Sequence, residues 1–147
     1  MKDNMRIFID SNIWIYFFLN SEKDFEKNQI AKRFLKSIVG KNQIILSTQV
    51  INEYHWTLYR KYKIDEEIIR STIDDKILTI SDVVTLSTNN YNSAFDLRKK
   101  YSISFWDSLI LASALENNCE ILYSEDMQHN QIIENKLKII NPFENAN

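Results

Sequence analysis

The sequence contains one cysteine, one glycine and one proline among its 147 residues. Phosphate-binding loops of the P-loop and dinucleotide-binding types need several glycines at close spacing, so the single Gly40 excludes both. The same shortage excludes flexible glycine linkers and proline-rich segments. The lone Cys119 has no partner for an internal disulfide bond. We therefore expect one domain over residues 1–147, without a flexible linker.

The sequence also lacks an excess of positive charge and a long apolar segment. Its net charge is −2 and its pI is about 5.7, so it has no overall basic field that would attract nucleic acid. Basic residues gather at 60–63 and 98–100, where solvated side chains at helix ends are the first explanation. The N-terminal MKDNMRIFID has no apolar run like that of a signal peptide. We expect a cytoplasmic protein with no membrane attachment.

Short β-branched runs alternate with amphipathic segments of helical spacing along the chain. The pattern predicts strands near residues 6–9, 43–46, 83–86, 120–123 and 138–140, and helices near 13–19, 25–38, 48–62, 65–78, 89–101 and 104–117. Strands that alternate with helices form a parallel sheet that is covered on both faces. The sequence therefore predicts a three-layer α/β/α fold with a central parallel sheet of four to five strands.

Four acidic residues stand near junctions at which a predicted strand gives way to a helix. Asp10 follows the first strand directly, and Asp126 closely follows the fourth. Glu53 lies within two turns of the second strand, and Asp107 is in the first turn of the late helix. In open α/β sheets, ligands bind at the carboxyl ends of the strands. Carboxylates, water and phosphate oxygens are the ligands that Mg²⁺ prefers, so the four acids together predict a divalent-metal site.

Three of these acids also have an ordinary structural explanation. Asp10 can be the N-cap of the helix that follows it, because aspartate is common at that position. Asp126 can be a turn residue. Glu53 can be a surface residue of its helix, at the edge of the apolar stripe. Taken one at a time, these explanations compete well with a functional one.

Asp107 is the most informative of the four acids. It can be the capping-box partner of Ser104 at the start of its helix. It also shares a helix face with three apolar residues, Ile110, Leu111 and Ala114, and this predicts a carboxylate that points toward the core. Burial of an ionised carboxylate without a partner is costly, so a bound cation would explain the residue and its neighbours together.

Three segments carry a resemblance to a known family: FIDSNIWI, LSTQVINEYHWTL and SFWDSLILASALENNCEILYSEDMQ, in this order and spacing. Over nearly its whole length the chain resembles the PIN-domain nucleases. The ending SEDMQH with a later NPF is similar to one bacterial subgroup, which includes members similar to the VapC-type toxins of toxin–antitoxin pairs. The resemblance implies a PIN-like parallel sheet flanked by helices.

The resemblance also implies a site and a cofactor, Mg²⁺ or Mn²⁺. Its principal metal ligands would be Asp10, Glu53 and Asp107, with Asp126 as the fourth acid. Two hydroxyl positions that help to orient such a site are matched by Ser11 and Ser124. A metal at these acids would activate water for the hydrolysis of a phosphodiester.

The match to the family is less close after the fourth strand. Met127 and Gln128 stand where the family often has a further acid and an aromatic residue. Asn130 stands where this subgroup often has glycine, so the loop is expected to differ in shape. Glu125 and Asp126 are therefore both candidates for the fourth acid.

The function implied by the resemblance is a metal-dependent endoribonuclease that hydrolyses RNA, acts as the toxin of a toxin–antitoxin pair, forms a homodimer and is silenced by a protein antitoxin. An aromatic run at Trp14, Tyr16, Phe17 and Phe18 cannot all face one core, so part of it is a candidate partner contact. A catalytically weak nucleic-acid-binding or regulatory module with the same fold is the alternative, and retention of all four acids argues against it.

Two further classes are disfavoured by the residues themselves. A phosphoaspartate receiver needs an acidic pair after its first strand and an aspartate after a central strand, but only Ser47 and Thr48 follow Leu46 here. Zinc would need His55, His129 or Cys119 as ligands. His55 lies two positions from Glu53 on a helix and so points to a different face.

Overall fold

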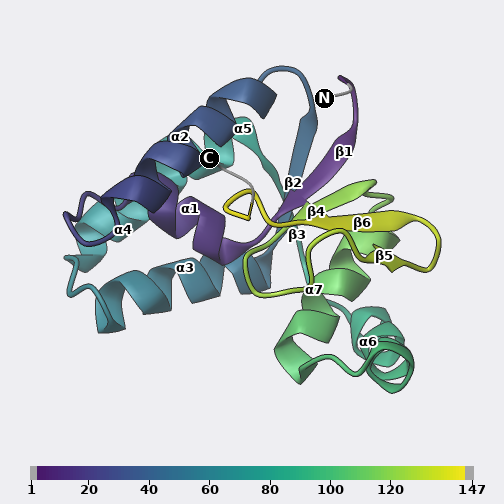
Figure 1. Cartoon of the computed structure of the whole chain (residues 1–147). Helices are drawn as coiled ribbons and strands as arrows, with labels where there is room; N and C mark the ends of the chain where they lie inside the picture. Colours follow the sequence, from purple (N-terminus) through teal and green to yellow (C-terminus); the bar gives the residue numbers. More distant parts are fainter. Residues whose placement is uncertain (1–2, 145–147) are drawn as a thin grey trace.

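A six-stranded sheet forms the centre of the computed structural model, which describes residues 3–144. The strand order is β3-β2-β1-β4-β6-β5 (Figure 1). The strands are β1 (Arg6–Ile9), β2 (Gln43–Ser47), β3 (Asp82–Val84), β4 (Ile121–Tyr123), β5 (Ile132–Ile133) and β6 (Leu137–Ile140). All neighbours pair in parallel except β5, which is antiparallel to β6. The predicted parallel sheet is confirmed, and the two-residue β5 is an addition that periodicity had not indicated.

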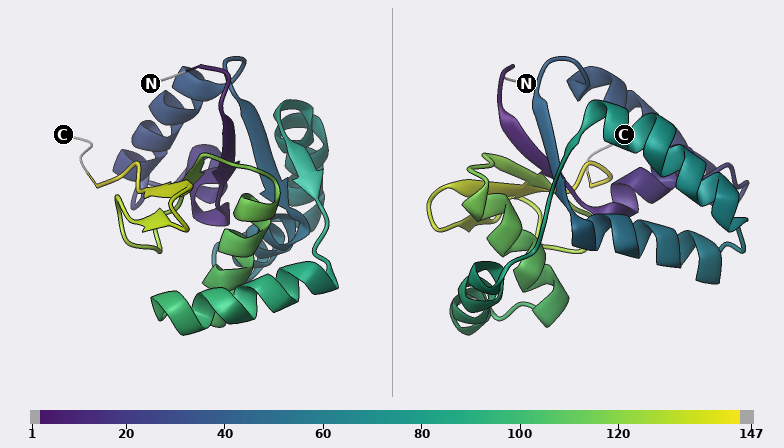
Figure 2. Two further views of the ribbon diagram at one scale, coloured as in Figure 1. Left: turned by 90° about the vertical axis from the view of Figure 1, so that its right-hand side faces the viewer. Right: turned by 180° about the vertical axis from the view of Figure 1, so that it is seen from behind.

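Helices cover both faces of this sheet, as the sequence predicted. They are α1 (Ser11–Phe18), α2 (Phe25–Ile38), α3 (Thr48–Arg60), α4 (Glu66–Thr72), the π-helix η1 (Ile73–Ile77), α5 (Leu78–Ile80), α6 (Thr88–Tyr101) and α7 (Phe105–Glu116). The helices α1 and α2 pack together on one side, whereas α6 and α7 form a pair on the other (Figures 1 and 2). The predicted domain 1–147 includes residues 1–2 and 145–147, which lie outside the described residues.

The central strand β1 is apolar because it is buried on both faces. Ile7, Phe8 and Ile9 are all fully buried, as expected for a strand inside a parallel sheet. The strand pairs with β2 on one side and with β4 on the other. Residues that directly follow β1 and β4 therefore emerge side by side at the carboxyl edge of the sheet.

The aromatic run of α1 is divided between core and surface. Trp14 is fully buried, while Tyr16, Phe17 and Phe18 are half-buried. Phe18 packs edge-on against Tyr54 of α3, with ring centroids 6.4 Å apart. Contacts within the chain therefore account for much of this run. No helix among residues 3–144 is both long enough and apolar enough to cross a membrane.

Cys119 provides a probe of folding, because it is buried two residues before the start of β4. Burial raises the pKa of its thiol to about 12, although the nearby charge of Arg6 acts in the opposite direction. The thiolate is the reactive form. We expect native protein to react with a thiol reagent at pH 8 on the order of 1,000-fold more slowly than urea-unfolded protein, in which the pKa returns to about 8.5. Rapid, complete labelling of the native protein would contradict this placement.

Candidate metal centre

Asp10 stands at the carboxyl edge of the sheet, beside the end of β4. Because Ile9 and Tyr123 are partners in the parallel register, Asp10 and Ser124 are neighbours. The Ser124 hydroxyl donates a hydrogen bond to Asp10 Oδ2 at 2.8 Å, and the Ser11 backbone N–H donates to Asp10 Oδ1 at 2.8 Å. Asp10 is also the N-cap of α1. The capping role and the site position therefore coexist in one residue.

Asp10 is only 3% exposed. Its pKa is raised to about 7, chiefly by burial; the hydrogen bonds from Ser124 and Ser11 act to lower it, and the charges of Glu53 and Asp126 contribute to the rise. A carboxylate in such surroundings is stabilised in its charged form by a nearby cation. The environment of Asp10 therefore suits an interaction with a cation.

Glu53 approaches the same region from the first half of α3. It is half-buried, and its Oε1 atom is inaccessible to solvent with no hydrogen-bond partner among the described residues. Burial raises the pKa of Glu53, the Gln49 side chain lowers it, and the charges of Asp107 and Asp126 raise it again. An unpartnered buried oxygen costs about 1–3 kcal/mol, and a bound cation would remove that cost.

Asp107 lies at the start of α7, where Ser104 is the N-cap. The Asp107 backbone N–H donates to the Ser104 hydroxyl at 3.1 Å. Its carboxylate is half-buried at the rim of the core, less deep than its helix face predicted. Burial raises its pKa, hydrogen bonding to Ser104 lowers it and the charge of Asp126 raises it. The start of α7 is held against α3 by Gln49, whose Nε2 donates to the Trp106 carbonyl at 3.1 Å.

The structure distinguishes the two candidates for the fourth acid. The Glu125 carboxylate forms an ion pair with Lys27 of α2. The Asp126 carboxylate instead accepts a hydrogen bond from Asn12 Nδ2 at 3.0 Å, and its charge raises the pKa values of the other three acids. The Asp126 backbone N–H donates to the Ser124 hydroxyl at 3.2 Å. This geometry favours Asp126 as the member of the acidic cluster.

The four acids form one cluster by the criterion that each interacts with the charge of another. Among residues 3–144, however, no three His, Cys, Asp or Glu side chains already stand as the ligands of a single ion. The donors are all oxygens, one of them buried without a partner. This set fits a hard divalent cation, which would take its remaining ligands from water.

Three residues that the sequence had not marked as part of the site support it. Asn12 donates a hydrogen bond to Asp126, and Gln49 of α3 donates one to the backbone of α7. Lys27 forms an ion pair with Glu125. Gln49 stands four residues before Glu53, a helical spacing that could have indicated it. Lys27 carried no such indication, because its partner is distant in the sequence. His55, considered above for zinc, contacts Glu66 of α4 at 2.9 Å.

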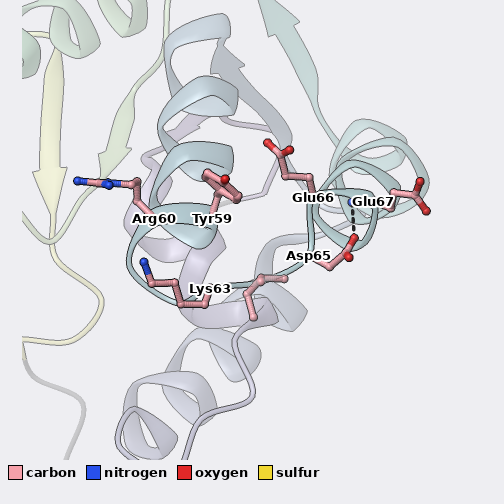
Figure 3. Close-up of a pocket in the computed structure, with 7 residues that line it drawn as sticks. Tyr59, Arg60, Lys63, Asp65, Glu66 and Glu67 are labelled. Atoms are coloured by element: carbon pink, nitrogen blue, oxygen red, sulfur yellow. Dashed lines mark hydrogen bonds between the residues drawn. The ribbon is translucent and has the colours of Figure 1, made fainter.

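A separate pocket of about 590 Å³ lies at the corner between α3 and α4 (Figure 3). It is lined by Tyr59, Arg60, Lys63, Ile64, Asp65, Glu66 and Glu67. None of the four clustered acids belongs to this lining. The Asp65 carboxylate accepts a hydrogen bond from the Glu67 backbone N–H at 2.8 Å as the N-cap of α4, so Asp65 has a structural role at the helix start.

A mostly parallel sheet with helices on both faces and a cluster of acidic side chains at its carboxyl edge defines an α/β protein with a site suited to a hard cation. Residues 7–134 match the PIN domain family, and the chain belongs to this family. The resemblance to the PIN-domain family that the three sequence segments carry is confirmed. No curated protein matches the chain in sequence.

Several solved structures share the fold. A toxin–antitoxin complex from Klebsiella pneumoniae is similar with a TM-score of 0.67 and 21% identity, over 94% of this chain and 98% of that one. Mycobacterium tuberculosis VapC20, described as a sarcin–ricin loop cleaving toxin, has a TM-score of 0.64 and 17% identity, over 82% and 91%. VapBC2 from Rickettsia felis, bound to a promoter DNA fragment, has a TM-score of 0.63 and 19% identity, over 93% and 100%. At these identities the likeness is one of fold.

Proposed function

We propose that the protein is a metal-dependent endoribonuclease in which Asp10, Glu53, Asp107 and Asp126 hold one or two Mg²⁺ or Mn²⁺ ions. The observation that carries the proposal is the buried Asp10 carboxylate, whose pKa is raised to about 7 within a cluster of like charges. Membership of the PIN domain family supports it independently. A module that only binds nucleic acid would have no use for this costly arrangement.

The chain's own residues prepare the site for hydrolysis. A bound divalent ion would supply a Lewis acid and an activated water for attack on the phosphodiester. Ser124 and the Ser11 backbone fix the orientation of Asp10, and Asn12 holds Asp126. When the oxygen of the attacking water bonds to phosphorus, the bond from phosphorus to O3′ would break, and O3′ would take up the proton that the water has lost. The products are a 5′-phosphate and a 3′-hydroxyl, and no protein nucleophile is required.

The same acids oppose an approaching polyanion until a cation is present. The net charge of the chain is −2, and four carboxylates concentrate negative charge at the sheet edge. Local repulsion of this kind is reduced when a divalent ion is bound. The proposal therefore has metal binding precede or accompany RNA binding.

We extend the proposal to a biological role as the toxin of a toxin–antitoxin pair. Its support is the shared fold of proteins described as toxins or as toxin–antitoxin complexes. In this role the protein would act in the cytoplasm as a homodimer, and a protein antitoxin would silence it. RNA is the proposed substrate.

Metal dependence provides the direct test of the nuclease. We expect cleavage of a mixed pool of structured RNAs with Mg²⁺ or Mn²⁺, and no cleavage with EDTA, because the acids alone cannot neutralise the charge that develops on the phosphoryl oxygens. Gel electrophoresis and mapping of 5′-phosphate ends measure both the rate and the chemistry. RNA that is bound yet remains intact with every metal would favour the binding module instead.

A further inference from the structure

Two of the three tryptophans lie on the surface, each close in sequence to one of the clustered acids. Trp14 is fully buried, but Trp56 is 59% exposed and Trp106 is 63% exposed. Trp56 stands three residues after Glu53 on α3, and Trp106 directly precedes Asp107 on α7. Large exposed aromatic rings give up the stabilisation that burial provides. Their position next to two of the proposed metal ligands indicates a use on this surface.

On α3 the exposed ring belongs to a continuous helix face. Gln49, Glu53, Trp56 and Arg60 follow at spacings of four, three and four residues, which places them in one stripe. Gln49, the first residue of the stripe, donates a hydrogen bond to the Trp106 carbonyl. At the other end, the Arg60 guanidinium carbon lies 5.7 Å from the centre of the Trp56 ring. The stripe thus runs from the acidic cluster to a positive charge.

The start of α7 repeats the combination of aromatic rings and positive charge. Phe105 and Trp106 pack edge-to-face with ring centroids 5.1 Å apart. The Arg98 guanidinium, from the last turn of α6, lies 5.9 Å from the centre of the Phe105 ring. Trp56 is therefore accompanied by an arginine directly, and Trp106 through its neighbour Phe105.

Both arginines keep their charge available. Within the described part of the chain, neither Arg60 nor Arg98 forms an ion pair with an acid. Figure 3 shows Arg60 pointing away from Asp65, Glu66 and Glu67, the acids of the neighbouring pocket. The explanation from sequence, that these are merely solvated charges at helix ends, omits their contacts with the aromatic rings.

We propose that Trp56 and Trp106 stack on unpaired bases that flank the phosphate bound at the acidic cluster, while Arg60 and Arg98 bind neighbouring phosphates. Aromatic rings combined with positive charge are the means by which proteins hold single strands, since every base has a stackable face. A duplex keeps its bases stacked on one another, so it cannot use these rings. The inference rests on the proposed function because it names how that site receives its RNA.

A second copy of the chain is the other occupant that two exposed rings suggest. The charges favour nucleic acid. Arg60 lies over the Trp56 ring and Arg98 lies over the Phe105 ring. The clustered acids would receive the metal and its phosphate. The centre of a protein interface is instead expected to be depleted of acidic residues, whereas Trp56 and Trp106 each stand close in sequence to an acid of the cluster.

The test measures RNA binding separately from cleavage. In an Asp107→Asn background, with Mg²⁺ at a concentration that saturates the three remaining acids, anisotropy compares a labelled single-stranded oligoribonucleotide with the same strand in a duplex. We expect Trp56→Ala and Trp106→Ala each to weaken single-strand binding by on the order of tenfold or more, with little effect on the duplex. Trp56→Phe should keep most of the affinity, because the ring is retained. Tyr91→Ala, which removes an exposed aromatic ring from α6, is the matched control.

The outcomes separate this inference from the nuclease itself. Single-strand binding that is unchanged in both tryptophan variants overturns the inference, even if the wild-type protein cuts RNA. Binding that depends on the tryptophans, in a protein that cuts no RNA with any metal, keeps the inference and rejects the nuclease. If the tryptophan variants change from dimer to monomer in sedimentation while their RNA affinity is unchanged, the surface binds a second copy of the chain. That result also overturns the inference.

Discussion

Asp107→Asn is expected to reduce metal-dependent RNA cleavage by roughly 1,000-fold or more, since a lost metal contact removes several kcal/mol of transition-state stabilisation. The substitution keeps the shape of the side chain and removes its negative charge. The helix start should survive, because the bond from the Asp107 backbone to the Ser104 hydroxyl is unaffected. Single-turnover cleavage at several Mg²⁺ concentrations measures the effect.

The unfolding free energy of the same variant provides an independent check. The charge of Asp126 raises the pKa of Asp107, so removal of the Asp107 charge relieves a repulsion and should leave metal-free protein at least as stable. Asp96→Asn, which removes the same charge from an exposed position on α6, is the matched control and should cut RNA normally. Full activity in Asp107→Asn would reject the assigned site.

Trp14→Ala is expected to lower the free energy of unfolding by about 3–5 kcal/mol, the usual cost of truncating a buried aromatic residue. Trp14 is fully buried, and its indole Nε1 donates to the Ile9 carbonyl at 3.2 Å. The substitution leaves a cavity and deprives that carbonyl of its bond, directly before Asp10. A typical domain is stable by only about 5–15 kcal/mol, so urea unfolding should reveal a large shift.

Trp56→Ala is the control for that experiment, because it removes the same side chain from an exposed position. A surface substitution of this kind usually changes the unfolding free energy by less than about 0.5 kcal/mol. The two variants should therefore differ by several kilocalories per mole. Equal losses would show that the burial assigned to Trp14, or the exposure assigned to Trp56, is wrong.

The fold could be predicted from the sequence because burial on both faces leaves a clear pattern. Strands such as Arg6–Ile9 are short, β-branched or aromatic, and bounded by polar residues, and the helices between them repeat at helical spacing. The antiparallel Ile132–Ile133 strand was missed. Two residues are too few to show any period, and this strand exists only because β6 lies beside it.

The acidic cluster was predictable only in part. Asp10 and Asp107 stood at the junctions where an α/β sheet binds ligands, and this position is visible in sequence. The choice between Glu125 and Asp126 was not visible, because it depends on the ion pair from Lys27, which comes from a distant helix. That the four acids compose a working metal site remains a prediction.

By itself the sequence determined the alternating fold, the four junction acids and the family, because each is written in local spacing or in short contiguous segments. Only the tertiary structure decided which side chains meet. It joined the starts of α3 and α7 through Gln49, turned Glu125 toward Lys27, and left Trp56 and Trp106 exposed while it buried Trp14. The physical reason is that such contacts join residues far apart along the chain, and their burial depends on how whole helices pack.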